Sequence, residues 1–183
     1  MALHVDSTKQ ALVDLANAMN KKSFSLSTIT VGPPSPDDSV PGMNSVAKFS
    51  AIKGKGYRGD VDVHYIRLTT EEAFGIDKYK YHLESLDNID PEAILKEVLT
   101  KLSTDWSLPL TGKGEIGEHT YEKVGDIDDI VIGTILVDLS PNYVLHEYLE
   151  ISLINPKIPL PDVIVITRLD GFREEDVELE DNG

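Results

Sequence analysis

Apolar residues recur at helical spacing in two stretches of the chain. The first stretch follows Ser7, whose hydroxyl can cap a helix, and the second follows Asp90-Pro91, an acidic cap with a proline in the first turn. The apolar positions of the first are Ala11, Leu12, Leu15, Ala16 and Met19. Those of the second are Ile94, Leu95, Val98, Leu99 and Leu102. This spacing predicts helices over 7–20 and 91–103.

Alternation of apolar and polar residues predicts two antiparallel hairpins. Ser45–Ile52 and Val61–Tyr65 alternate on either side of a glycine-rich turn, which is typical of a hairpin with one buried and one solvated face. Ile130–Leu139 and Tyr143–Ile154 form the second such pair, separated by a Ser-Pro-Asn turn. Each predicted hairpin therefore follows a predicted helix.

These elements predict an α+β protein made of two similar units, each a helix with an antiparallel hairpin. The first unit covers 1–76 and the second covers 77–155. A Pro-rich segment and C-terminal strand follow over 156–172, with the β-branched run Val163–Ile166 as the strand. Residues 173–183 form an acidic tail.

The two units share a short motif at the end of each predicted helix. Phe24-Ser25-Leu26 and Trp106-Ser107-Leu108 both read aromatic-Ser-Leu at the same offset. A gapped comparison of any α+β chain with itself can give such a match, but the shared motif favours a duplication. We therefore expect the units to superpose, and we expect Phe24 and Trp106 to pack beneath the helix ends.

The composition narrows the classes of protein to consider. The chain has 183 residues, no Cys and a formal net charge of -15. The charge argues against nucleic acid as the main partner, and it either keeps the chain soluble or steers it toward a basic partner. The missing Cys fits a reducing cytoplasm. Without a signal-like start or an apolar run of about 20 residues, we expect neither secretion nor a membrane.

Sequence motifs for metal binding, phosphate binding or catalysis are weak throughout the chain. The histidines lack the spacing of a metal site; they are His4, His64, His82, His119 and His146. Asp126–Asp129 lacks the central Gly and distal Glu of a calcium loop. Gly54–Gly56 and Gly112–Gly114 lack the spacing of a phosphate loop, and no Gly-x-Ser-x-Gly occurs. The sequence therefore predicts no catalytic residue, no cofactor and no metal.

One resemblance suggests a function. The run Ala11–Leu68, with its Phe24 helix exit and its Gly-Tyr-Arg-Gly-Asp-Val-Asp-Val turn and strand, resembles virion structural proteins of large tailed bacteriophages, a two-repeat α+β family. Ala93–Ile154 is similar to the second half of those proteins. The chain departs from them after Asn155, where it adds the Pro-rich segment and the acidic tail.

The resemblance implies a non-enzymatic structural component of a virion, in the tail, baseplate, neck or capsid surface. Such a protein would be made in the host bacterial cytoplasm and would contact other virion proteins in a symmetric multi-copy assembly. The family supplies no catalytic residues to transfer. The alternative is a soluble acidic adaptor or a chaperone-like assembly module, and a third hypothesis is an enzyme with carboxylate chemistry.

Candidate partner contacts lie in the first hairpin turn and in the acidic tail. They are Lys55, Tyr57, Arg58, Glu174, Glu175, Asp176, Glu178, Glu180 and Asp181. The tail has few apolar residues to hold it against the fold. We therefore expect it to be ordered only within the assembly, against a Lys- or Arg-rich surface of another subunit.

Overall fold

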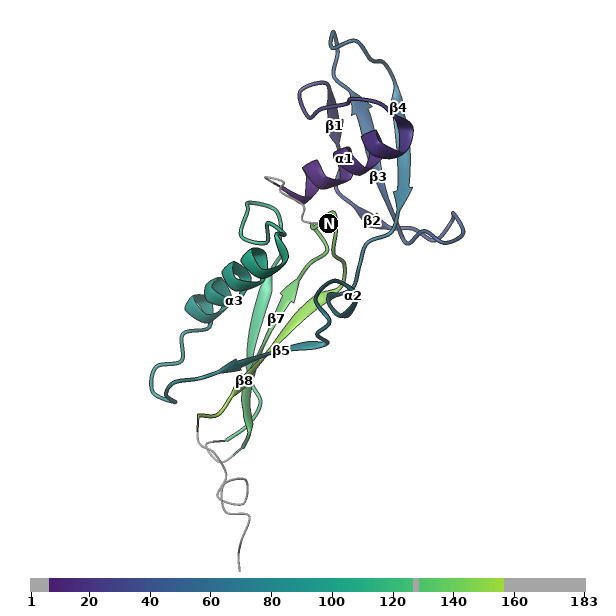
Figure 1. Ribbon diagram of the computed structural model, residues 1–183. Coiled ribbons are helices and arrows are strands. Elements are labelled where there is room, and N and C mark those ends of the chain that lie inside the picture. The colour runs from purple at the N-terminus through teal and green to yellow at the C-terminus, as the bar shows by residue number, and fades with distance from the viewer. Residues whose placement is uncertain (1–6, 127–128, 157–183) are drawn as a thin grey trace, which may run out of the picture.

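The computed structural model describes residues 7–126 and 129–156, and these form two units placed end to end (Figure 1). In each unit a long helix covers one face of a sheet. The sheets contain antiparallel and mixed strands, so the predicted α+β class is confirmed.

The first unit begins with helix α1, Thr8–Asn20. Ser7 caps it as predicted, because its side chain accepts a hydrogen bond from the backbone N–H of Gln10. The chain leaves the helix at Lys21, which adopts a left-handed conformation with φ of 51°. The strands that follow are β1 (Ile29–Val31), β2 (Ser35–Pro36), β3 (Ser45–Ala51) and β4 (Asp60–Tyr65).

Strand β3 is the centre of the first sheet. It pairs with β1 and β2 along one edge and with β4 along the other, antiparallel in every case. The register of β3 with β4 runs from Ser45 opposite Tyr65 to Ser50 opposite Asp60. The first predicted hairpin is therefore confirmed.

The second unit contains helices α2 and α3 and a mixed sheet. Helix α2 is counted with it, although the predicted boundary lies after residue 76, because Phe74 of α2 packs in the same core as α3. Asp90 caps α3 and Pro91 occupies its first turn, as predicted from the sequence. The elements are α2 (Thr70–Phe74), β5 (Lys78–His82), α3 (Pro91–Trp106), β6 (His119–Lys123), β7 (Val131–Asp138) and β8 (Tyr148–Ile154). The strand order is β5-β8-β7-β6, with β5 parallel to β8 and the other pairs antiparallel.

The second predicted hairpin is partly wrong, because its second strand begins at Tyr148 and not at Tyr143. The side-chain oxygen of Asn142 accepts hydrogen bonds from the N–H groups of Val144 and Leu145, which turns the chain locally. Leu145 then forms a parallel bridge with Leu68. This segment therefore serves contacts with the first unit and does not extend β8.

Both units place a helix before three antiparallel strands in sequential order. Helix α1 precedes the neighbours β1-β3-β4, and α3 precedes the neighbours β6-β7-β8. Superposition of the two units stays a prediction. A clear difference lies at the outer edge, where β5 covers β8 but β4 pairs with β3 alone among the described strands.

Each unit has its own apolar core. The larger core fills the space between α3 and the second sheet, and Phe74 of α2 belongs to it. Its most deeply buried side chains include Val98, Leu110, Ile135, Val137, Leu139, Leu149, Ile151 and Leu153. The smaller core lies between α1 and the first sheet, and it also receives Tyr143 from the second unit.

Buried polar contacts around Arg67 join the two units. Its Nη1 donates to the backbone oxygens of Ser140, Asn142 and Leu145 at 2.9, 3.1 and 3.4 Å. Its Nε donates to the Ser45 hydroxyl at 2.8 Å. Burial lowers the pKa of the Arg67 guanidinium, and the nearby charges of other residues offset this in part. One buried cation thus holds both units at their junction.

A second contact joins Glu115 of the second unit to the start of α1. The buried carboxylate accepts hydrogen bonds from the N–H and the hydroxyl of Thr8. A negative charge is favourable there, because unpaired N–H groups and the helix dipole make a helix start positive. Asn142 donates to the Glu115 backbone oxygen at 3.2 Å. The orientation of α1 therefore depends on residues of the second unit.

The prediction that Trp106 packs beneath its helix end is wrong, since the side chain is 48% exposed. Ser107 turns the chain with φ of 52°, and Leu108 and Leu110, which follow it, are buried in the larger core instead. Trp106 lies against Phe74, with 5.6 Å between ring centroids. Phe24 is half-buried against the smaller core.

Trp106→Ala should therefore lower the free energy of unfolding by only about 1–2 kcal/mol, as expected for a half-exposed aromatic pair. Phe74→Ala is the matched comparison, because Phe74 is buried in the larger core and its loss should cost about 3–5 kcal/mol. Urea denaturation followed by circular dichroism measures both. Equal losses for the two variants would contradict the surface position of Trp106.

Candidate docking site

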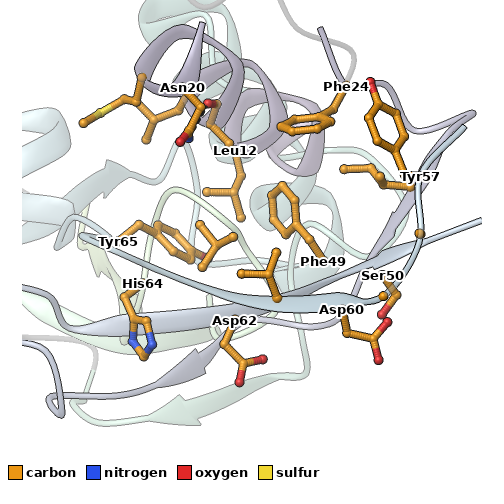
Figure 2. A pocket seen from close by; sticks show the side chains of 18 of the residues that line it. Leu12, Asn20, Phe24, Phe49, Ser50, Tyr57, Asp60, Asp62, His64 and Tyr65 are labelled. Atoms are coloured by element: carbon orange, nitrogen blue, oxygen red, sulfur yellow. Dashed lines mark hydrogen bonds between the residues drawn. The ribbon is translucent and has the colours of Figure 1, made fainter. Parts of the chain in front are cut away.

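An apolar groove of about 690 Å³ lies between α1 and β4 (Figure 2). Helix α1 supplies one wall and the hairpin supplies the other. The apolar side chains of the two walls are Leu12, Leu15, Ala16, Met19, Val61, Val63 and Tyr65. The alternation of β4 places every second side chain toward the helix, which explains why valine and tyrosine line the groove.

The floor and the far end of the groove are also apolar. Ile29 and Phe49 form the floor and are themselves buried. At the end, the rings of Phe24 and Tyr57 meet edge to face with 5.3 Å between centroids. The side chain of Asn17 fixes Phe24 by exchanging two hydrogen bonds with its backbone, at 2.6 and 2.8 Å.

Several large apolar side chains of this groove remain open to solvent. Met19 is 77% exposed, Val61 is 58% exposed and Leu15 is 48% exposed. Full burial of such a side chain contributes about 1.5–3 kcal/mol relative to leaving it in water. A contiguous apolar surface of this kind marks an interaction site more often than it marks ordinary surface.

The polar side chains of β4 lie on the opposite face of the sheet. Figure 2 shows Asp60, Asp62 and His64 on the side of β4 away from α1. His64 lies 3.7 Å from the Asp37 carboxylate there. The groove therefore presents apolar side chains to a ligand, and the acidic side chains face away from it.

The backbone edge of β4 beside the groove is open. The Ala51 N–H donates to the Gly59 oxygen, which sets the alternation of bonds between β3 and β4. The N–H and C=O groups of Asp60, Asp62 and His64 consequently point to the edge that no described strand covers. Unpaired edges of this kind are templates for an added strand.

In the second unit, β5 covers the corresponding edge. Tyr79 and Tyr81 of β5 are half-buried against the larger core, beside α3. The Tyr81 hydroxyl donates to the Glu97 carboxylate of α3 at 2.7 Å, and this bond raises the pKa of Tyr81 to about 12. In the second unit, β5 thus covers the outer edge of β8 beside α3, whereas no described strand covers the outer edge of β4 in the first unit.

The structure brings two of the predicted contact residues to this groove. Tyr57 and Arg58 line it, whereas Lys55 lies exposed in the preceding turn. The six predicted acidic contacts, all between 174 and 181, lie outside the described residues. Partner contact by any of these residues stays a prediction.

The sequence reasoning missed the residues that leave the groove open. Leu15 and Met19 continue the apolar stripe of the helix predicted over 7–20, yet both are exposed. A useful signal was the width of that stripe. A single hairpin presents few inward side chains, so a wide helical stripe above it indicates that another element is needed to cover it.

The fold and the groove define the class of the protein. It is an α+β protein of two helix-and-sheet units, and the first unit has an apolar groove beside an unpaired strand edge. The chain belongs to the family of unknown function DUF7941, whose model matches residues 1–179. No curated protein and no solved structure matches the chain.

No helix within 7–126 and 129–156 is long and apolar enough to span a bilayer. In the same residues, no cluster of three His, Cys, Asp or Glu could hold a metal ion.

Proposed function

We propose that the chain is a non-enzymatic structural component of a tailed bacteriophage virion and acts through protein–protein contacts. The observation that supports this best is the groove between α1 and β4, where solvent-exposed Leu15, Met19 and Val61 lie beside an unpaired strand edge. Both features favour binding of another polypeptide.

The resemblance of Ala11–Leu68 to virion structural proteins supports the narrower part of the proposal. The helix, the Phe24 exit and the Tyr57–Asp60 turn that carry the resemblance also build the groove. The surface that would bind a partner therefore coincides with the region of resemblance.

An acidic adaptor or assembly chaperone is the second candidate. The net charge of -15 favours it, because an acidic surface can occupy a basic groove on a partner until assembly replaces it. The two candidates differ in where the chain is found at the end of assembly. A structural subunit stays in the particle, and a chaperone leaves it.

The test is quantitative mass spectrometry of particles purified from lysates of bacteria that produce the chain. We expect the chain in a fixed ratio to the major capsid protein, unchanged after washing in high salt. Its presence only in the soluble fraction would contradict the proposal and favour the chaperone.

A matched pair of variants links incorporation to the groove. Met19→Asp places a charge in the groove, whereas Ala18→Asp places the same charge on an exposed position of α1 outside it. We expect Met19→Asp to reduce incorporation about tenfold or more, as for a hot-spot position, and Ala18→Asp to leave it unchanged. Equal incorporation of the two variants would contradict a role for the groove.

A further inference from the structure

We propose that the groove receives the segment Val163–Ile166 of a second copy of this chain, as a fifth strand of the first sheet, parallel to β4. This inference names the partner that binds in the groove of the proposed function. It rests on that proposed function in one respect, namely that the groove is a protein-binding site. Three features support it: the arrangement of the second unit, the chemistry of the segment, and the reach of the C-terminal region.

The second unit shows what completes this arrangement. There β5 runs parallel to β8, from Lys78 opposite Glu150 to His82 opposite Ile154. Its Tyr79 and Tyr81 fill the space between the outer strand and the helix. The order and pairing of the elements, α1 before β1-β3-β4 and α3 before β6-β7-β8, make β4 the counterpart of β8 and the groove the counterpart of β5. The missing element is a short parallel strand.

The sequence of residues 163–166 suits a strand in the groove beside β4. Val-Ile-Val-Ile consists of β-branched residues, which favour strands, and alternate side chains point to opposite faces. One pair of side chains would enter the groove against Leu15 and Met19, and the backbone would bond to the open edge of β4. Pro159 and Pro161 lack an N–H group, but both lie before the run, so every residue of 163–166 has an N–H group available for strand pairing.

The chain's own segment cannot reach this site. A parallel strand must begin beside Asp60, and the Asp60 end of β4 and the Ile154 end of β8 lie at opposite ends of the molecule (Figure 1). Strands β8 and β4 alone span roughly 20 and 17 Å, and the junction between the units adds to this separation. The nine residue steps from Ile154 to Val163 reach about 31 Å at most when fully extended. The donor must therefore be a second copy.

This arrangement joins different surfaces of the two copies. Each copy offers a groove at one end and a segment at the other, so the contact is head to tail and continues to a third copy. Such a contact builds rings or filaments, depending on the rotation between neighbours.

The test uses the purified full-length chain in solution, without other proteins, in sedimentation velocity experiments. We expect oligomers whose size increases with concentration. A groove variant, Met19→Asp, and a segment variant, Ile164→Asp with Ile166→Asp, should each weaken self-association about 30-fold or more. Ala18→Asp should leave it unchanged. A wild-type chain that stays monomeric at about 100 μM, well above typical affinities for specific interfaces, would overturn the inference.

Mixing the two variants gives the decisive result. The segment variant keeps an intact groove and the groove variant keeps an intact segment, so an equimolar mixture should form one-to-one dimers that cannot grow further. Failure of the mixture to associate, or oligomers of either variant alone equal to those of the wild type, would overturn the inference. If the wild-type chain is monomeric but is found in particles, the inference falls and the proposed function stands.

Discussion

Replacing Arg67 with methionine is expected to lower the free energy of unfolding by about 3–5 kcal/mol, as for the loss of one partner in a buried charged network. The side chain is almost fully buried and donates to Ser45 and to three backbone oxygens of 140–145. Methionine fills much of the same volume but donates no hydrogen bond. Four acceptors at the junction of the units would then lose a donor.

Urea denaturation monitored by circular dichroism measures this loss. Arg58→Met is the matched control, because Arg58 lies in the exposed hairpin turn, and a surface substitution changes stability by about 0.5 kcal/mol or less. Arg67→Lys keeps the charge but not the planar set of donors, so we expect an intermediate loss. If Arg67→Met and Arg58→Met have the same midpoint, the Arg67 network contributes nothing to stability.

Local signals in the sequence predicted the parts of the fold that depend on local interactions. The caps at Ser7 and Asp90 formed as expected, because a helix start is stabilised by side chains within the first turn. The hairpin of β3 and β4 also formed, since a glycine-rich turn and alternating residues indicate it.

The missed features depend on residues distant in the sequence. Parallel pairing of β5 with β8 joins Lys78 to Glu150 across the whole of α3, and no short motif predicts such a pair. The exposure of Leu15 and Met19 has the same origin, because the position of the strands opposite α1 decides whether an apolar stripe is covered. The candidate groove was therefore not predictable from periodicity alone.

Replacing Tyr143 with alanine is expected to lower the free energy of unfolding by about 3–5 kcal/mol, as for truncation of a buried aromatic. Tyr143 belongs to the second half of the sequence, yet it is only 7% exposed in the core of the first unit. Its hydroxyl donates to the Gly32 oxygen and its N–H donates to the Thr8 hydroxyl, each at 3.0 Å. Lys9 lies over its ring, 5.3 Å from the centroid.

Two further variants separate the contributions of Tyr143. Tyr143→Phe removes the hydroxyl that donates to Gly32 and keeps the ring, so it should cost about 0.5–1.5 kcal/mol. Tyr57→Ala truncates an aromatic of the first hairpin turn, but Tyr57 is exposed, so the loss should be smaller than for Tyr143→Ala. Denaturation midpoints of the three variants give this order.

Hydrogen exchange then shows where Tyr143→Ala acts. Because Tyr143 fills the core beneath α1, the amide protons of α1 should lose protection first, while those of α3 keep most of theirs. Equal loss of protection in both helices would mean that the two units unfold together and that Tyr143 stabilises the whole molecule. Unchanged protection in α1 would contradict the role of Tyr143 as the link between the units.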